Sequence, residues 1–285
     1  MNDHRTALVA EALGSPVRSV QALSGGCVSE VCRVESEAGS RLVAKFGPFA
    51  VLEEERAGLQ TLAEAKAVRV PQVTCLHGAE EAAVLLMEEL VVGSDPDWGR
   101  FGRDLALLHS TTVGERYGFD LDNHLGTTPQ PNGWMDDWVA FNRTRRHGPL
   151  VDALVVRGAL TGDDLELVRR VLASLGGVLP ERPRPSLLHG DLWSGNAIPL
   201  EGGGVAVIDP APYVGHALAD IAMMQLFGGF PPACFEGYLD AGGEGFDPAC
   251  LAVYRLHHLL NHLLLFGPGY LSGVRGECRL ILDAC

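Results

Sequence analysis

The chain has 285 residues, of which 47% are hydrophobic and 20% charged, and its formal net charge is −14. This length provides one large domain or two lobes with ample core, and the acidic balance argues against a nucleic-acid or anionic-membrane surface, which needs stripes of Lys and Arg. Seven scattered cysteines without Cys-x-x-Cys pairing, a polar N-terminus and no run of about 20 apolar residues predict a reduced, cytoplasmic protein without a membrane span.

The first informative stretch is a glycine pair, Gly25 and Gly26, between two β-prone runs. It predicts a hairpin whose tip can approach a phosphate closely. A plain hairpin stays open as the alternative, because the Gly-x-Gly-x-x-Gly form is absent. The next strand, residues 42–46, carries Lys45 near its end, as does the kinase strand whose lysine contacts the α- and β-phosphates. A solvated edge lysine is the alternative.

A helical pattern follows that strand and offers a partner for Lys45. Leucines at positions three before, four after and seven after Glu55 place this acid on the buried side of the helix. We therefore expect Glu55 to pair with Lys45. The two acids before it fit a solvated first turn that favours the helix dipole.

The strand 83–90 has an acidic end, Glu88-Glu89-Leu90, and a loop of the form Gly-Ser-Asp-Pro follows at residues 93–96. In a two-lobed kinase this strand would lead into the hinge, and the backbone near Glu88, Glu89 and Leu90 would bind adenine. We place the lobe boundary near residue 91.

Two features in the middle of the chain are more typical of a structural role than of a catalytic one. A predicted helix over 98–110 ends at His109, which favours a dipole or packing role. A helical pattern over 136–146 ends in the arginine cluster 143–146. Those arginines either touch a phosphate or, more commonly, form a solvated helix end that the dipole favours.

The strongest pattern is His189-Gly190-Asp191 followed, five positions after the Asp, by Asn196. This is the Asp-x₄-Asn spacing of the kinase catalytic loop, and Asp209 closes the strand that comes next. Phosphoryl transfer needs one carboxylate to orient the attacking hydroxyl, and an amide oxygen with a second carboxylate to hold Mg²⁺. The alternative for each residue alone is a turn or strand cap.

An apolar helix over 251–266 carries one polar stripe, in which His257 and Asn261, and His258 and His262, are each four residues apart. Histidines at this spacing can bind zinc, but no third ligand is evident. A buried hydrogen-bond network or the wall of a substrate pocket fits better. Asp220 opens another apolar helix, where it either caps the helix or braces the catalytic loop.

Taken together, these residues resemble the fructosamine kinase (ketosamine-3-kinase) family, a branch of the protein-kinase-like and aminoglycoside-phosphotransferase-like group. The resemblance runs from about residue 24 to the C-terminus, and its most specific segments are 117–120, 129–134, 137–138, 189–196, 226–230 and 258–267. It implies an α+β, two-lobed protein-kinase-like fold. Residues 1–90 would form a small nucleotide-binding lobe with an antiparallel sheet, and residues 91–285 a larger, mainly helical lobe with the catalytic loop and substrate pocket.

The resemblance also implies roles for individual residues. Asp191 would be the base or hydroxyl-orienting group, with Asn196 and Asp209 on Mg²⁺. The ATP-binding set would be Gly25, Gly26, Lys45, Glu55, Glu88, Glu89 and Leu90. The substrate would contact Trp193, His258, Asn261 and His262, although Trp193 is equally placed to pack in the core. One departure is His216-Ala217-Leu218, where the family usually has charged residues, and it leaves any charge interaction there in doubt.

The implied activity is ATP- and Mg²⁺-dependent phosphorylation of the 3-hydroxyl of ketoamines (fructosamine, ribulosamine or erythrulosamine) in deglycation. The alternatives are an aminoglycoside or choline-like phosphotransferase and a non-catalytic ATP-binding pseudokinase. Expected partners are small-molecule or protein-bound ketoamines, with no nucleic acid and no membrane. The chain would be a monomer or a homodimer, and Cys27 is a candidate redox-sensitive link between subunits.

Overall fold

The computed structural model describes residues 3–23, 30–111 and 114–285, so the predicted roles of Gly25, Gly26 and Cys27 lie outside the described residues. Two compact units are present. Unit 1 consists of Met1–Asp97 and Ala197–Pro210, and unit 2 of Trp98–Asn196 and Ala211–Cys285. The functional division at residue 91 stays a prediction.

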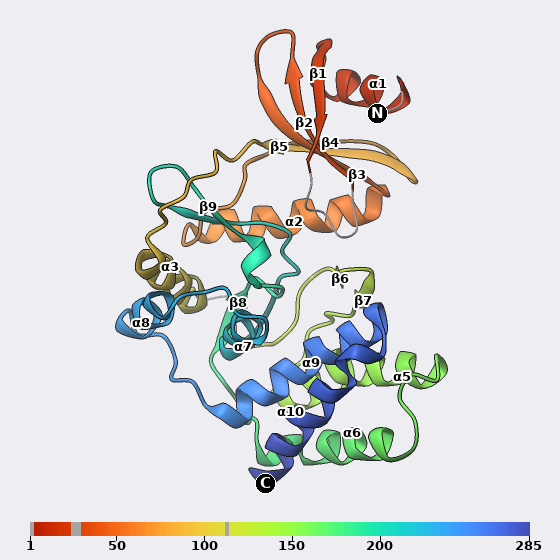
Figure 1. The fold of residues 1–285 in the computed structure, drawn as a ribbon, viewed down its shortest axis with the longest axis vertical. Coiled ribbons are helices and arrows are strands. Elements are labelled where there is room, and N and C mark those ends of the chain that lie inside the picture. The colour runs from red at the N-terminus through yellow and green to blue at the C-terminus, as the bar shows by residue number, and fades with distance from the viewer. Residues whose placement is uncertain (1–2, 24–29, 112–113) are drawn as a thin grey trace. The chain divides into compact units, whose positions relative to one another are not determined.

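Unit 1 is built on a five-stranded antiparallel sheet with the order β1-β2-β3-β5-β4 (Figure 1). Its elements are α1 (Asp3–Leu13), β1 (Val17–Ala22), β2 (Glu30–Ser36), β3 (Arg41–Gly47), α2 (Phe49–Ala65), β4 (Val73–Ala79) and β5 (Ala82–Glu88). A later hairpin, β9 (Ala197–Pro199) with β10 (Val205–Val207), belongs to the same unit.

The two faces of this sheet pack against different helices. Ala44 and Phe46 of β3 join a buried cluster with Val9 of α1. Successive strand side chains alternate between faces, so Lys45 points to the opposite face, as does its register partner Leu85. Helix α2 covers that second face with a buried stripe of leucines, Leu52, Leu59 and Leu62. The alternation of β3 therefore aims Lys45 at α2.

Unit 2 is mainly helical. Its helices are α3 (Trp98–Ser110), α4 (Trp138–Phe141), the π-helix Asn142–His147, α5 (Gly148–Val156), α6 (Gly162–Ser174), α7 (Leu218–Leu226), α8 (Pro232–Asp240), α9 (Pro248–Phe266) and α10 (Leu271–Asp283). Short 3₁₀ turns cover Leu175–Gly177, Ser194–Asn196 and Pro268–Tyr270. Its strand pairs are β6 (Asn123–Leu125) with β7 (Thr128–Gln130), and β8 (Pro185–Leu188) with β11 (Tyr213–His216).

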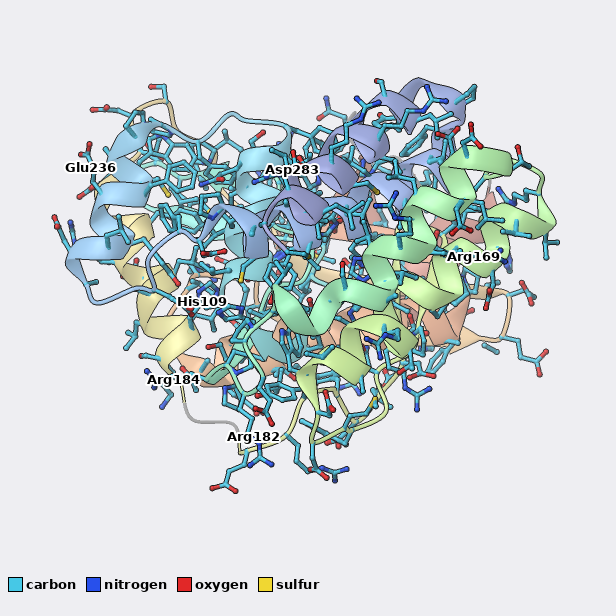
Figure 2. All side chains as sticks on the ribbon, turned by 90° about the horizontal axis from the view of Figure 1, so that it is seen from below. His109, Arg169, Arg182, Arg184, Glu236 and Asp283 are labelled. Carbon is cyan, nitrogen blue, oxygen red and sulfur yellow. The ribbon has the colours of Figure 1, made fainter. Side chains whose placement is uncertain are left out.

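Helix α9 is the central element of unit 2 and begins at an N-cap in which Asp247 accepts a hydrogen bond from the Cys250 amide. It is apolar around most of its circumference, as is typical of a helix buried on all sides. Exposed charges such as Arg182 and Glu236 extend away from the ribbon of this unit, whereas His109 is buried (Figure 2). Among the described residues, no helix combines the length and apolar character that crossing a lipid bilayer requires.

Within the arginine cluster, Arg143 is exposed as expected, but Arg146 departs from the expected solvated helix end. Arg146 is buried between the rings of Phe141 and Tyr213, with its guanidinium carbon 4.5 Å and 3.9 Å from the two ring centroids. It donates to the Pro131 carbonyl and to Asn132 Oδ1. Burial lowers the pKa of Arg146. The π-helical turn directs this side chain inward, and nothing in the local sequence signals such a turn.

Candidate active site

Unit 1 brings together three of the predicted residues, Lys45, Glu55 and Asp209. Lys45 Nζ lies 2.6 Å from Glu55 Oε2 and 2.9 Å from Asp209 Oδ1. The side chains of Lys45 and Glu55 are 12% and 10% exposed, whereas Asp209 is 44% exposed. Glu53 pairs instead with Arg56 of its own helix. The leucine spacing therefore correctly predicted that Glu55 is the helix acid that pairs with Lys45.

This trio holds one cation against two carboxylates. Burial acts to lower the pKa of Lys45, but Glu55 and Asp209 outweigh it and the net shift is upward, so the ammonium stays charged. Burial raises the pKa of Glu55 to about 7; Lys45 opposes the rise and the second carboxylate, Asp209, adds to it. The trio has an excess negative charge when fully ionised, which favours binding of a further cation.

Asp209 follows β10 and has a left-handed backbone, with φ of 52°. This region is unusual for residues other than glycine, and aspartate tolerates it better than most. The strain is on the order of 1–3 kcal/mol and is typical of functional positions. The bend turns the chain sharply at the point where the carboxylate meets Lys45.

Unit 2 holds the catalytic-loop residues. Asn196 Nδ2 donates to the Asp191 carbonyl at 2.9 Å and lies 3.4 Å from Asp191 Oδ2. Because a carbonyl accepts only, this bond fixes Nδ2 and leaves Asn196 Oδ1 as an acceptor. The Asp191 amide donates to His189 Nδ1 at 3.2 Å. His189 thus shapes the loop from inside, being fully buried.

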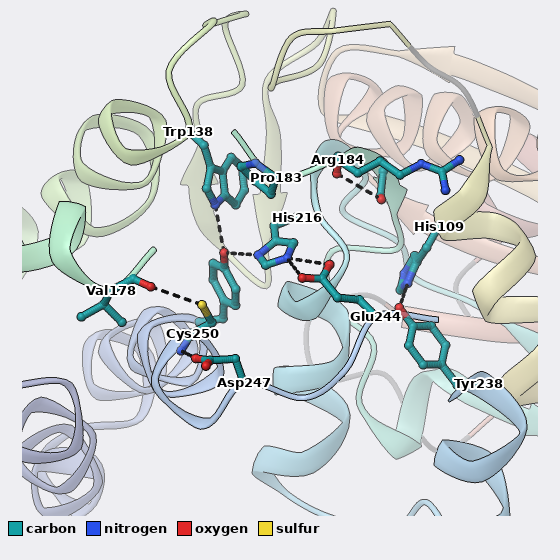
Figure 3. Close-up of polar contacts among 12 residues, drawn as sticks. His109, Trp138, Val178, Pro183, Arg184, His216, Tyr238, Glu244, Asp247 and Cys250 are labelled. Carbon is teal, nitrogen blue, oxygen red and sulfur yellow. Dashed lines mark hydrogen bonds and ion pairs between the residues drawn. The ribbon is translucent and has the colours of Figure 1, made fainter. Parts of the chain in front are cut away.

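A buried carboxylate braces this loop through the backbone. Asp220 accepts from the amides of His189 and Gly190 at 2.8 Å and 2.9 Å. Asp220 Oδ2 also lies 3.1 Å from His109 Nε2. His109 Nδ1 in turn lies 3.1 Å from the Tyr238 hydroxyl (Figure 3). Burial alone would raise the pKa of Asp220, but His109, His189 and the Gly190 amide together lower it. The sequence left the role of Asp220 open and gave no sign of its partners.

Gly190 stands where protein kinases have arginine, and its surroundings explain why. Its φ is +83°. A Cβ at this position would overlap the Ala211 carbonyl, while the Ala211 amide donates to His189 O at 2.9 Å. The loop and the residue after Asp209-Pro210 therefore pack backbone against backbone, which only glycine permits.

The four predicted substrate contacts differ in exposure. Trp193 is 36% exposed and its ring lies directly over Gly195. His258 and Asn261 are buried, and Asn261 Nδ2 donates to the Leu125 carbonyl. Asn261 lines a cavity of about 10 Å³, room for one water molecule rather than a sugar. His262 keeps partial exposure. Contact of all four with substrate stays a prediction.

The residues expected near adenine have their side chains engaged in unit 1. Glu88 pairs with Arg69 and accepts from the Gln72 amide, and Glu89 pairs with Arg33. Leu90 is half-buried. The Glu88 amide already donates to the Gln72 carbonyl at 2.8 Å. Adenine binding by the backbone of this segment stays a prediction.

Hard oxygen ligands suit Mg²⁺, which needs few protein ligands because it keeps several waters. Asp209 offers an exposed carboxylate, and Asn196 offers Oδ1 as its remaining acceptor. The donor types fit the metal. Asp209 belongs to unit 1 and Asn196 to unit 2.

The family model for fructosamine kinase matches residues 1–284. The chain belongs to the fructosamine kinase family. A probable ketoamine kinase of Synechocystis sp. is 34% identical over 272 residues, covering 92% of this chain and 90% of the relative. The chloroplastic protein-ribulosamine 3-kinase of Oryza sativa subsp. indica is 31% identical over 276 residues, which cover 93% of this chain and 79% of the relative. Family membership identifies the protein as a kinase.

Solved structures agree with this assignment. A candidate fructosamine-3-kinase from Thermobifida fusca superimposes with a TM-score of 0.86 at 29% identity, covering 98% of both chains. A thermostable mutant of the aminoglycoside phosphotransferase APH(4)-Ia, in a ternary complex with ADP and hygromycin B, gives a TM-score of 0.66 at 18% identity and 98% coverage of both chains. The second match bears on the fold alone. The predicted kinase-like α+β fold is confirmed.

Proposed function

We propose that this fructosamine kinase family member transfers the γ-phosphoryl group of ATP to the 3-hydroxyl of ketoamines. The observation that carries the proposal is the pair of preformed sets, Lys45 with Glu55 and Asp209, and Asp191 with Asn196. A binding module without turnover commonly lacks one of these residues. The names of the Synechocystis and rice relatives support a ketoamine acceptor.

In the proposed reaction, the substrate hydroxyl loses its proton to the Asp191 carboxylate. The oxygen forms a bond to the γ-phosphorus while the bond from that phosphorus to the bridging oxygen breaks, and ADP leaves. Lys45 offsets the charge of the phosphates, and Glu55 holds Lys45 in place. Mg²⁺ held by Asn196 and Asp209 would supply further charge neutralisation. The 3-phosphorylated ketoamine then decomposes and frees the amine, which completes deglycation.

For the acceptor, we propose that Trp193 and His262 contact substrate directly, because they retain exposed surface. His258 and Asn261 are buried and would support that wall from behind. The nucleotide would rest against the glycine pair and the backbone of residues 88–90. Free and protein-bound ketoamines both fit this scheme, as do a monomer and a homodimer.

The test is ATP consumption with Mg²⁺ across ribulosamine, erythrulosamine and fructosamine derivatives of lysine, with kanamycin and choline as rival acceptors. We expect turnover on at least one ketoamine and a loss of about 10²–10⁴-fold in Asp191→Asn. The matched control Asp240→Asn alters an exposed acid on α8 and should keep parental activity. Turnover on kanamycin alone would reassign the acceptor, and ATP binding without turnover on any acceptor would favour the pseudokinase alternative.

A further inference from the structure

Three aromatic side chains of unit 2 gather around His262 where α7 and α9 end. The His262 ring centroid lies 4.7 Å from Phe227, 5.3 Å from Phe266 and 5.1 Å from Tyr270. Phe227 is 43% exposed and Phe266 is 59% exposed. Aromatic rings gathered in this way and left open to solvent are typical of binding surfaces. We call Phe227, His262, Phe266 and Tyr270 the aromatic wall.

The Phe227 end of the aromatic wall lies close in sequence to a contact with the catalytic loop. Two residues after Phe227, the backbone of Gly229 packs directly against Ser194, because a Cβ there would overlap the serine side chain. Ser194 follows Trp193, whose exposed ring folds over Gly195. An exposed aromatic side chain therefore lies close in sequence to each partner of the Gly229–Ser194 contact. Asp191 lies three residues before this contact.

The chemistry of the wall suits an amine. His262 Nδ1 lies 2.8 Å from the His258 carbonyl, which can only accept, so Nδ1 carries the proton and Nε2 is the acceptor of a neutral ring. Burial lowers the pKa of His262, which keeps the ring uncharged near neutral pH. Aromatic faces attract cations within about 6 Å. A ketoamine has a basic nitrogen next to its sugar carbons, and that nitrogen bears the amine's carbon chain.

We propose that the aromatic wall binds the amine-bearing part of the acceptor, so that the enzyme selects ketoamines by their amine as well as by their sugar. The preferred class is ketoamines whose nitrogen bears an extended aliphatic or aromatic group. This inference rests on the proposed ketoamine kinase function. It adds Phe227, Phe266 and Tyr270 to the acceptor site as specificity-determining residues.

The experiment compares ribulosamines of methylamine, butylamine and benzylamine, which share the sugar and differ only in the amine. We expect KM for the benzylamine derivative to be about tenfold below that for the methylamine derivative, with similar kcat, since aromatic contacts of this kind are worth about that factor. In Phe227→Ala/Phe266→Ala this preference should disappear, and KM for the methylamine derivative should change little. Equal KM values across the parental series would overturn the proposal.

Two controls separate folding from recognition. Phe235→Ala removes a half-buried ring of α8 outside the wall, and it should keep the parental preference. Phe227→Leu/Phe266→Leu preserves apolar volume, so a folded variant that still loses the preference for benzylamine assigns the effect to the aromatic faces. If folded Phe227→Ala/Phe266→Ala keeps the full preference for the benzylamine derivative, the proposal is wrong.

A binding measurement distinguishes failure of this inference from failure of the proposed function. Saturation-transfer NMR on the ribulosamine of benzylamine, without ATP, reports contact whether or not the compound is phosphorylated. We expect stronger transfer to the aromatic protons than to the sugar protons, reduced in Phe227→Ala/Phe266→Ala. If this pattern is observed but the compound is not phosphorylated, only the proposed ketoamine kinase reaction is rejected, and the wall remains the amine site. Equal transfer to all protons would reject the wall as the amine site.

Discussion

The two units position their functional side chains in different ways. In unit 1, Lys45 lies between the carboxylates of Glu55 and Asp209, in two ion pairs of which the one with Asp209 is also a hydrogen bond. In unit 2, the backbone around His189 and Gly190 is held by hydrogen bonds to Asp220, which is itself buried and partnered by His109. The first arrangement has an excess negative charge. The second is complete within the protein.

This difference indicates how each region responds to its surroundings. An arrangement made of ionised groups changes with pH and with bound cations, because each proton or metal alters the balance. An arrangement of directional hydrogen bonds to backbone amides keeps its geometry until a partner is removed. We therefore expect substitutions at Gly190 and Asp220 to reduce activity at every pH, and substitution of Glu55 to change the pH profile.

Among residues that position the reacting groups, Gly190→Ala should have the largest effect. The methyl group would overlap the Ala211 carbonyl and also sit at a φ of +83°. Displacement of the loop by about 1 Å is enough for a loss of about 100-fold in kcat. Steady-state kinetics on the best ketoamine measures it. The matched control is Gly202→Ala, which has a φ of +84° but no neighbour within 4 Å of its Cβ. Equal losses in the two variants would show that backbone strain, rather than the contact, matters.

Asp220→Asn should have the next largest effect. The neutral amide group has one acceptor oxygen for the two backbone N–H donors of His189 and Gly190, so both lose a charged acceptor and one of them faces an NH2 donor. We expect unfolding free energy to fall by about 3 kcal/mol and kcat to fall about tenfold or more, equally between pH 6 and pH 9. Denaturant titration and kinetics across pH measure both. Asp164→Asn, at an exposed ion pair with Arg275, is the matched control and should change each by little. A kcat loss confined to low pH would contradict the positioning role.

The local sequence identified residues wherever spacing alone determines a face or a turn. Leucine periodicity put Glu55 on the inner side of α2, and the strand alternation put Lys45 opposite it. The Asp-x₄-Asn spacing located Asp191 and Asn196, which the structure shows in contact. Each of these is a consequence of one element's period or of a single tight loop.

The features that the sequence could not predict are contacts between residues that lie far apart in the chain. His109 and Asp220 are separated by 111 positions, and His109 and Tyr238 by 129. A histidine at the end of an amphipathic helix looks the same whether it faces solvent or a buried carboxylate. The burial of Arg146 could not be predicted for a similar reason, because it depends on a π-helical turn and on two rings from separate segments.

Glu55→Gln should have a moderate, pH-dependent effect. Because the pKa of Glu55 is about 7, its carboxylate is half protonated there, and the ionised pair with Lys45 forms fully only above about pH 8. We expect the parental kcat/KM for ATP to rise from pH 6 to pH 8. The variant should lose about tenfold at pH 8, less at pH 6, and show a flatter profile.

The contribution of Glu55 to folding stability changes with pH in the opposite direction to its contribution to activity. Its pKa is higher in the folded than in the unfolded state, so its contribution is full below about pH 4.5 and is lost as pH rises through 7. Thermal unfolding of parent and Glu55→Gln at pH 5 and pH 8 measures this difference. The control is Glu53→Gln on the same helix, where Arg56 lowers the pKa and the profile near neutrality should stay parental. Parallel pH profiles for parent and Glu55→Gln would refute the charge-based account of unit 1.

The smallest effect concerns the departure at His216. Trp138 Nε1 donates to the Tyr254 oxygen at 2.9 Å, and the Tyr254 hydroxyl lies 2.7 Å from His216 Nδ1 (Figure 3). Since the indole only donates, the tyrosine proton points to Nδ1, and His216 Nε2 donates to Glu244 at 2.7 Å. The hydrogen bonds thus all donate in one direction, from Trp138 to the half-exposed carboxylate of Glu244. Glu244→Ala removes the last acceptor and should lower the free energy of unfolding by about 1 kcal/mol.

Activity separates this network from the brace at Asp220. His216 ends β11, which pairs with β8 ahead of the catalytic loop, but it makes no bond to the loop itself among the described contacts. Glu244→Ala should therefore keep kcat within about twofold, while Tm falls by about 2–4 °C. Glu236→Ala, an exposed acid on α8, should change neither. A loss of kcat as large as that in Asp220→Asn would mean that unit 2 transmits strain from β11 to Asp191, and that the hydrogen bonds to Asp220 do not isolate the loop.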